Sequence, residues 1–439
     1  MFCQTTIALR VSLGICLTTA ALAQTAFTAL PKDPGPRSGP PGAGAAITGL
    51  SASQLAAFTD GSTRFQEVDS VSNGLGPRFN SNSCASCHAF PAVGGSSPAN
   101  NPQATFANAS NVLPSFIQSN GPVREARFIR NPNGTPDGGV HALFVISGRS
   151  DTPAGCNITQ ENFSNTANIS LRIPTPAFGL GLIEAIPDAA LVQNLVANSG
   201  PKSFFGISGR LNHSGNDGTV TRFGWKAQNK SLAIFTGEAY NVEMGITNLL
   251  FPNERDDAPN CSPKADPQDN LDFSSTGLGM LDDTASFTAF MRFLAPPSPG
   301  PSDPSVSRGS FLFGSTGCAL CHTTTLQTGV SAFGPALSNQ TIHPYSDFAL
   351  HSMGPGLADQ ISQGQAAGDE FRTAPLWGLG QRIFFLHDGR TSDLLQAISL
   401  HFSRGNTQFQ GSEANTVIQN FNGLSNTDQQ ALLIFLRSL

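Results

Sequence analysis

Apolar residues repeat with a helical spacing near the middle and at the end of this chain of 439 residues. Residues 284–294 (TASFTAFMRFL) and 427–439 (TDQQALLIFLRSL) place apolar side chains at i, i+3 and i+4, and each segment begins at a threonine that can cap a helix. A further helix is predicted over residues 51–58. The pattern therefore predicts that each half of the chain ends in a closing helix.

Short apolar runs lie in the long first half of the chain. Residues 140–146 (VHALFVI) and 231–235 (SLAIF) are predicted to be β-like or extended. The chain holds 45 glycines and 31 prolines, and 12% of its residues are charged, which is about half the usual share. We expect a mainly α fold with extensive irregular loops, a few short strands and an apolar core.

The first residues are typical of an export signal. Residues 1–23 carry a single charge at Arg10, then an apolar run, and end in a small-residue cleavage site before Gln24. The run is too short and interrupted for a membrane anchor, and no other stretch approaches a membrane span. We therefore expect a signal peptide, no integral membrane segment in the mature protein, and a periplasmic or secreted location.

Two segments rich in proline and glycine divide the remaining chain. Residues 24–47 lack periodicity and are expected to form a flexible lead-in. Residues 296–305 contain several prolines that cannot continue a helix, so they are predicted to be a linker. The domains are therefore predicted at 48–295 and 306–439, and the first is much longer than the second.

Two motifs of the form Cys-x-x-Cys-His carry the clearest chemistry. They are Cys84-Ala85-Ser86-Cys87-His88 and Cys318-Ala319-Leu320-Cys321-His322. In this motif the two thiols add to the vinyl groups of a haem, and the adjacent histidine takes the iron. Two zinc sites or two thiol pairs are the alternative, but each motif has only one nearby histidine and no second Cys-x-x-Cys within zinc-finger distance. The sequence predicts two covalently bound haem c groups, with His88 and His322 as proximal ligands.

The surroundings of the two motifs also repeat. Gly61-Ser62-Thr63-Arg64-Phe65 precedes the first motif, and Gly309-Ser310-Phe311-Leu312-Phe313 precedes the second. A helix before the motif and a closing helix after it are how small c-type cytochrome domains surround a haem. We therefore expect two cytochrome c-like haem domains, the first of them enlarged.

The remaining cysteines and the net charge add two expectations. Cys3 and Cys16 leave with the leader, so Cys156 and Cys261 remain, and two spare cysteines in an oxidising compartment most often form a disulfide. Two unpaired thiols are the alternative. The net charge of -6 argues against a nucleic-acid partner and does not identify a redox partner.

Five further segments carry a resemblance that spans nearly the whole mature chain. They are Asn73–Asn80 (NGLGPRFN), Phe178–Pro187 (FGLGLIEAIP), Thr221–Ala227 (TRFGWKA), Phe371–Leu379 (FRTAPLWGL) and Leu386–Arg390 (LHDGR). With both haem motifs, the chain resembles the di-haem oxidoreductase family of peroxidases, and it is similar to the bacterial di-haem cytochrome c peroxidases and to the di-haem enzyme that matures methylamine dehydrogenase.

The resemblance guides the choice of distal iron ligands. His401 ends a helix predicted over residues 393–401 and looks like the position where the peroxidases carry a distal methionine, so we expect it to ligate the second haem at a lowered potential. Met353 is the alternative ligand, and a surface histidine is the alternative role of His401. For the first haem His141 is the candidate, against the role of a hydrogen-bonded core histidine.

Other candidates concern proton and electron transfer. Glu184 lies in an apolar, glycine-rich context where burial raises a carboxyl pKa, which suits an acid/base, although it could equally bond a turn. The resemblance implies an aromatic residue between the haems, and we favour Trp225 over Trp377, with core packing as the competing role. Haem propionates or iron ligands could be contacted by polar residues at four positions: Arg222, Lys226, His387 and Arg390.

Two functional classes follow from these expectations. The first is an enzyme that reduces hydrogen peroxide, or uses it to oxidise an organic or protein substrate, with electrons relayed through the other haem from a small redox protein. The second is an electron carrier with two six-coordinate haems, and distal coordination of the first haem separates the two classes. A calcium ion between the domains is expected only by analogy, since no acidic loop of ligand spacing requires one.

Overall fold

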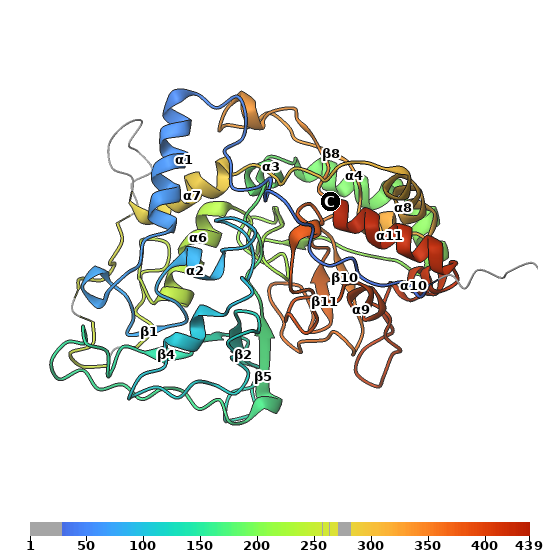
Figure 1. The fold of residues 1–439 in the computed structure, drawn as a ribbon. Coiled ribbons are helices and arrows are strands. Elements are labelled where there is room, and N and C mark those ends of the chain that lie inside the picture. The colour runs from blue at the N-terminus through green and yellow to red at the C-terminus, as the bar shows by residue number, and fades with distance from the viewer. Residues whose placement is uncertain (1–28, 257, 263, 271–281) are drawn as a thin grey trace, which may run out of the picture.

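Two crossed helix pairs form the frame of the molecule (Figure 1). Helix α1 (Ala52–Phe65) packs on α7 (Asp283–Phe293), and α8 (Pro304–Ser315) packs on α11 (Asn426–Ser438). The two predicted closing helices are thus confirmed. Their N-caps are Asp282 and Ser425 rather than the threonines that follow them, because these side chains accept the backbone N–H groups at the helix start.

The repeated glycine explains how closely the helices of each pair cross. A Cβ on Gly61 would lie 2.1 Å from the carbonyl oxygen of Ser286, and a Cβ on Gly309 would lie 2.1 Å from that of Ala431. Only a residue without a side chain fits at such a crossing. The short sequence repeat therefore marks the same packing device in both halves of the protein.

The computed structural model describes residues 29–256, 258–262, 264–270 and 282–439, so the predicted signal peptide lies outside the described residues. The other helices of this part are α2 (Cys84–Cys87), α3 (Leu180–Glu184), α4 (Asp188–Ala197), α5 (Ser199–Phe205), α6 (Leu232–Met244), α9 (Leu394–Ser399) and α10 (Asn415–Asn422). Short 3-10 turns are η1 (Val71–Asn73), η2 (Pro102–Thr105), η3 (Thr166–Asn168), η4 (Cys318–Leu320), η5 (Pro335–Leu337) and η6 (Leu379–Gln381).

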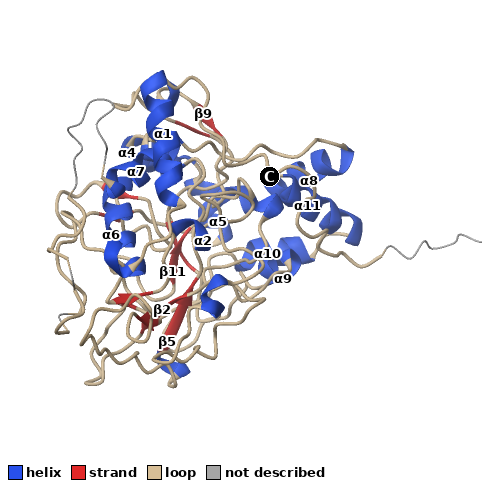
Figure 2. Ribbon diagram, turned by 60° about the vertical axis from the view of Figure 1, so that its left-hand side comes forward, coloured by secondary structure: helices blue, strands red, loops and turns tan. Residues whose placement is uncertain are grey.

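The strands are short and form small antiparallel sheets, which Figure 2 shows below and between the helices. They are β1 (Arg78–Phe79), β2 (Glu125–Phe128), β3 (Val140–His141), β4 (Phe144–Val145), β5 (Ile169–Arg172), β6 (Asn212–His213), β7 (Val220–Thr221), β8 (Leu326–Gln327), β9 (Thr341–Ile342), β10 (Leu350–Ser352) and β11 (Glu370–Arg372). The three-stranded sheet has the order β3-β2-β5, and the other sheets are pairs: β1-β4, β6-β7, β8-β9 and β10-β11. A mainly α fold with irregular loops and a few short strands is therefore observed.

One predicted extended segment is helical. Residues 231–235 begin α6, where the Ser231 hydroxyl accepts the N–H of Ile234 as an N-cap. The apolar run is short enough to suit either a strand or a buried helix, and packing of α6 against α3 and α7 decides for the helix. Residues 140–146 do contain two strands, β3 and β4, as predicted.

Two hydrophobic cores lie under this frame, and the larger one crosses the predicted domain boundary. It contains most buried residues of the first half, together with Leu337, Phe348 and Trp377 from the second half. The smaller core gathers apolar residues of α8, α11 and the segment between Leu379 and Leu394. The larger core therefore spans the boundary between the regions predicted as domains, 48–295 and 306–439.

The lead-in is held in place along its described part, contrary to the expectation of flexibility. Asp33 accepts two hydrogen bonds from the guanidinium of Arg437, at 2.8 and 2.6 Å. Further along, Ala46 forms a β-bridge with Leu294. Proline and glycine prevent regular structure here, but they leave the backbone groups free to bond to distant segments. Residues 29–47 thus form a strap across both halves.

The disulfide prediction is confirmed. Cys156 and Cys261 are bonded, with their Cα atoms 4.7 Å apart and a sequence separation of 105. The bond joins two loops of the enlarged first half. In the part of the chain that the structure describes, no helix is both long enough and apolar enough to span a membrane.

Candidate functional site

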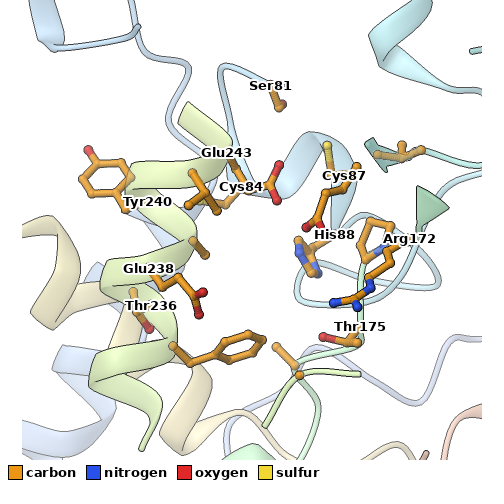
Figure 3. A pocket seen from close by; sticks show the side chains of 18 of the residues that line it. Ser81, Cys84, Cys87, His88, Arg172, Thr175, Thr236, Glu238, Tyr240 and Glu243 are labelled. Atoms are coloured by element: carbon orange, nitrogen blue, oxygen red, sulfur yellow. The ribbon is translucent and has the colours of Figure 1, made fainter. Parts of the chain in front are cut away.

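Each Cys-x-x-Cys-His motif lies in the wall of its own large cavity. The first cavity, of about 1260 Å³, is lined by Cys84, Cys87 and His88, and Figure 3 shows them beside α6. The second, of about 1400 Å³, is lined by Cys318, Cys321 and His322. Both volumes include space that is open to solvent.

The thiols of the motifs suit covalent attachment of such a group. All four cysteines are free, so neither motif has closed into a disulfide. Burial raises the pKa of Cys87 and of Cys318 to about 11, which keeps these thiols protonated near neutral pH. Free thiols facing a large and mainly apolar cavity are what addition to haem vinyl groups requires.

Both motif histidines are oriented as iron ligands would be. Nδ1 of His88 donates to the carbonyl oxygen of Gly95 at 3.0 Å, and Nδ1 of His322 donates to that of Tyr345 at 2.9 Å. A hydrogen bond of this kind fixes the ring and leaves Nε2 as the nitrogen that can ligate iron. Burial lowers the pKa of both histidines, that of His322 to about 4, so the neutral ligating form predominates.

An aromatic side chain from the repeat supports each of these rings. Phe65 meets the ring of His88 edge-on with centroids 6.0 Å apart, and Phe313 lies 6.2 Å from the ring of His322. These phenylalanines end the repeated segments that begin at Gly61 and Gly309. Each repeated segment therefore supplies both the glycine at the helix crossing and the phenylalanine that contacts the motif histidine.

The second cavity contains further histidines. His401 follows α9 and lines the cavity with its Nδ1 bonded to the carbonyl oxygen of Ala397 at 2.8 Å. Burial lowers its pKa, and its charge in turn contributes to the lowered pKa of His322, so the two rings are close. Met353 also lines this cavity. The structure thus brings together the proximal candidate and both distal candidates.

A buried ion network beside Cys321 was not anticipated from the sequence. His351 lies between Asp347, at 3.1 Å, and Glu413, at 2.7 Å, and the ammonium of Lys202 lies 3.3 Å from Asp347. Burial opposes the charge of His351, but Cys321, Asp347 and Glu413 surround the ring with acidic groups and its pKa is raised well above the usual range. Glu413 and Lys202 are distant from His351 in sequence, and only Asp347, four residues before it, is a local partner.

Three carboxyl groups line the first cavity: Glu125, Glu238 and Glu243. In Figure 3 Glu238 and Glu243 extend from α6 into the cavity, and Glu238 faces His88 across it. The sequence analysis missed both because it predicted an extended segment where α6 begins. Predicting a helix over residues 231–245 would have placed Glu238 and Glu243 on the same element.

Two of these groups form a hydrogen-bonded pair with opposite pKa shifts. Burial, followed by the charge of Glu125, raises the pKa of Glu243 well above its usual range. Burial acts in the same direction on Glu125, but the guanidinium groups of Arg127 and Arg172 outweigh it and lower the pKa. Within this pair Glu243 is therefore the member that keeps its proton to higher pH, and Glu125 is the member that ionises first.

Glu184, the predicted acid/base, lies outside both cavities. Its Oε2 accepts a hydrogen bond from Nε of Arg292 at 2.7 Å, and its Oε1 accepts the N–H of Leu232 at 2.9 Å. This carboxylate joins α7 to the start of α6. The geometry corresponds to the alternative of a structural hydrogen bond and does not support the acid/base role.

His141, the predicted distal ligand of the first haem, also lies away from the first cavity. Its Nε2 is 3.1 Å from Asp137, its Nδ1 bonds to Glu161, and its ring stacks on Phe128. Burial opposes the charge, but the two carboxylates outweigh it and raise the pKa of His141. With both nitrogens bonded to acids, the ring does not offer an iron ligand.

Trp225 lines both large cavities. Its Nε1 donates to the carbonyl oxygen of Ile173 at 3.0 Å, and its ring meets His387 edge-on with centroids 6.4 Å apart. Trp377 lines neither and contacts only a small cavity next to Trp225. Of the two tryptophans, the structure therefore brings only Trp225 to the wall between the cavities.

The predicted propionate contacts are distributed unevenly. His387 lines the second cavity and stacks on Phe371, and burial lowers its pKa to about 4. By contrast, Arg222 pairs with Asp188, Lys226 with Asp359 and Arg390 with Asp388, and none of these cations lines a cavity. Within the described ranges no group of three or more His, Cys, Asp and Glu side chains could hold a metal ion, and the expectation of calcium is not tested.

Several solved structures are similar to parts of the chain. BthA, a di-haem peroxidase of Burkholderia thailandensis, is 18% identical over 36% of this chain and 50% of its own length, with a TM-score of 0.24. A MauG-like protein associated with microbial copper homeostasis is 16% identical over 61% and 89% of the two chains, with a TM-score of 0.29. Hydrazine synthase of Kuenenia stuttgartiensis is 14% identical over 98% and 100%, with a TM-score of 0.33. The chain thus matches half of BthA, and these low scores carry no weight in the assignment below.

The sequence itself matches a known family over most of its length. No curated protein matches the chain. The family described as "Di-haem oxidoreductase, putative peroxidase" matches residues 145–439, a segment that includes the second haem motif and begins after the first. Together with two cavities that each present a Cys-x-x-Cys-His motif, this match shows that the chain belongs to the di-haem oxidoreductase family.

Proposed function

We propose that this protein is an exported di-haem c-type peroxidase. In this proposal Cys84 and Cys87 attach a haem in the first cavity, and Cys318 and Cys321 attach one in the second. Each bound haem supplies an iron that can change its oxidation state and that has two axial positions. His88 and His322 would each hold one of these irons, and the other residues lining each cavity would decide what that haem can do.

The observation that carries the proposal is the difference between the two cavities. The second is lined by His322 together with His401, so two imidazoles are at hand for one iron. Among the described residues that line the first, His88 is the only histidine, and carboxyl groups of α6 face it. Two histidine ligands suit electron transfer, whereas an open position next to acidic groups suits reaction with hydrogen peroxide.

Proton transfer in the first cavity is assigned to α6 and β2. Reduction of hydrogen peroxide to two waters consumes two electrons and two protons. Glu243 is the member of the pair that keeps its proton and can donate it, and Glu125, hydrogen-bonded to it, can accept a proton from water and return it to Glu243 for the second transfer. Glu238 faces His88, where the leaving oxygen needs its proton. These groups take the role that the sequence analysis gave to Glu184.

Electrons are proposed to pass between the cavities at Trp225. This side chain contributes to both walls, and its N–H bond to Ile173 fixes the ring in that position. The electrons would enter at the second haem from a small redox protein. Covalent haem attachment of this type takes place outside the cytoplasm, which agrees with the leader predicted over residues 1–23 and with a periplasmic or secreted location.

An electron carrier is the second candidate, and one observation favours it. Met244 and Met291 also line the first cavity, and Sδ of Met244 lies 3.8 Å from Sγ of Cys84. A thioether can fill the second axial position of a haem. If either methionine did so, the protein would hold two six-coordinate haems and would transfer electrons without reacting with peroxide.

Electron paramagnetic resonance of the oxidised and the half-reduced holoprotein separates the two candidates. A peroxidase should show a high-spin ferric signal, in one state or the other, that disappears when hydrogen peroxide is added. Two low-spin signals that persist after half-reduction and ignore peroxide would refute the peroxidase and leave the carrier.

Matched glutamate variants test the proton assignment. Glu243→Gln and Glu238→Gln should slow the reaction with peroxide, and general acid-base catalysis typically contributes about 10²–10⁴-fold. Glu184→Gln is the control, because Glu184 pairs with Arg292 outside the cavities. Equal rates in all three variants and the unmodified protein, at two haems per chain, would contradict the assignment.

A further inference from the structure

Two arginines in the wall of the second cavity lack an acidic partner. Arg372 belongs to β11 and Arg382 follows η6, and both line the second cavity as well as the small cavity that contains Trp225 and Trp377. Arg372 has an exposed fraction of 7%. Among the described residues no carboxylate lies within ion-pair distance of either guanidinium, since neither takes part in any of the salt bridges.

Their charges are therefore not compensated by the protein. Burial lowers the pKa of Arg382 to about 10 with no opposing carboxylate, and burial together with the charge of Arg382 lowers the pKa of Arg372 to about 10. Other buried arginines differ in this respect: Arg172 pairs with Asp359 and Arg437 with Asp33. A buried charge without a partner is costly, so a cationic pair of this kind indicates an anionic ligand.

We propose that Arg372 and Arg382 bind the propionate carboxylates of the second haem. This inference rests on the proposed function only in requiring that a haem occupies the second cavity. Two carboxylates neutralise the two guanidinium charges, and each guanidinium presents several N–H donors in one plane for a carboxylate.

The position of this arginine pair also predicts on which side of the second cavity the propionates would lie. Propionates lie on the porphyrin edge opposite the vinyl groups, which Cys318 and Cys321 hold. Nε of Arg372 donates to the carbonyl oxygen of Gly224 at 2.9 Å, next to Trp225 in sequence. Arg372 and Arg382 would therefore hold the propionates on the side of the second cavity that is next to Trp225.

Arg390, which the sequence analysis also named for propionates, does not compete with this pair. Arg390 donates to Asp388 at 2.7 Å and to the carbonyl oxygen of Gly356 at 2.8 Å, and it is exposed. It lies only eight positions after Arg382 and carries the same charge. Arg390→Gln is consequently a matched control for Arg382→Gln.

The test is the midpoint potential of each haem, measured by spectroelectrochemistry without peroxide. Removing a positive charge next to a haem favours its ferric form, so Arg372→Gln and Arg382→Gln should each lower the potential of the second haem and leave that of the first unchanged. Arg390→Gln should change neither potential. Arg382→Lys keeps the charge and should stay close to the unmodified protein.

The alternative source of a carboxylate is a small organic acid that binds from solution. Adding acetate or succinate should not alter the potential of the unmodified protein if the propionates already occupy the arginines. A potential that shifts with added carboxylate, or that is the same in both glutamine variants and the unmodified protein, would overturn the proposal.

Two controls keep this outcome distinct from failure of the proposed function. Haem is counted as the pyridine haemochrome, and fewer than two haems per unmodified chain would refute the proposed function together with this inference. Low-spin signals that match the unmodified protein verify that His322 and its distal ligand stay in place in each variant. Absence of peroxidase activity would refute the proposed peroxidase function. The midpoint potentials would still test whether Arg372 and Arg382 bind the propionates.

Discussion

Asp359 is the most consequential single carboxylate in the interior, and its replacement tests how the two halves are held together. Its Oδ2 lies 2.7 Å from Nη2 of Arg172, and its Oδ1 lies 2.9 Å from Nζ of Lys226. The exposed fractions of these three side chains are 0%, 3% and 0%. Arg172 also lines the first cavity, so one acid neutralises two buried cations near the proposed peroxide site.

Asp359→Asn should destabilise the protein by about 3–5 kcal/mol at pH 7, because removing one member of a buried ion pair leaves its partner charged and unpaired. The upper part of the range is expected, since two cations lose the same carboxylate. Urea unfolding of the holoprotein, followed by circular dichroism, measures the loss. Asp428→Asn is the control, because its partner Arg308 has an exposed fraction of 50%, and a loss under about 1 kcal/mol is expected there.

The pH dependence of Asp359→Asn gives a second check on the same reasoning. Burial lowers the pKa of Lys226 to about 8 against the opposing charge of Asp359, so in the variant this pKa falls further. Lys226 therefore has two pKa values to compare, one in the folded variant and a higher one, about 8, in the folded unmodified protein. Between these two values Lys226 has lost its proton in the folded variant but keeps it in the folded unmodified protein. The variant therefore gains stability relative to it as pH rises toward 8. A loss no larger than that of Asp428→Asn, or a gap that widens over this range, would refute the account.

Three other predictions follow from separate features. Trp225→Phe should slow reoxidation of the second haem by peroxide in stopped-flow measurements, whereas Trp377→Phe should leave it unchanged, and equal rates for both variants would remove Trp225 from the path. Burial, with the charges of Glu67 and Asp283, raises the pKa of Asp69 from 3.8 to about 7, so its stabilising effect is present below pH 3.8 and lost as pH rises through 7. Asp69→Asn should accordingly unfold at a higher temperature than the unmodified protein at pH 8, with the difference fading toward pH 4, and a constant difference would contradict this. Replacing Cys156 and Cys261 by alanine opens a loop of 105 residues and should cost about 2–5 kcal/mol in urea unfolding, and reduction should destabilise only the unmodified protein.

Features that depend on neighbouring residues could be predicted from the sequence. The haem motifs depend on covalent spacing, and the closing helices depend on a period that a single segment displays. The repeat of Gly61 and Gly309 was visible as a pattern, although only the helix crossing explains why glycine is needed there. The disulfide could be inferred by elimination among eight cysteines.

Features that depend on distant partners could not be predicted. Glu184 and His141 have the local context of functional residues, but the atoms that engage them come from Arg292 and Glu161, which lie 108 and 20 residues away. Glu238 and Glu243 were missed for a different reason. A run of four apolar residues, Leu232 to Phe235, is compatible with a strand or with the first turn of a helix, and the choice depends on the elements that pack against it.

The strap formed by residues 29–47 has a consequence for the order of folding. Asp33 leaves the ribosome early, but its partner Arg437 is synthesised 404 residues later. Because closing a loop of that length costs conformational entropy, we expect this contact to form after the transition state for folding. Contacts made so late slow unfolding without accelerating folding. We therefore expect loss of the strap to raise the unfolding rate, and so to shorten the lifetime of the folded protein, while the refolding rate stays unchanged.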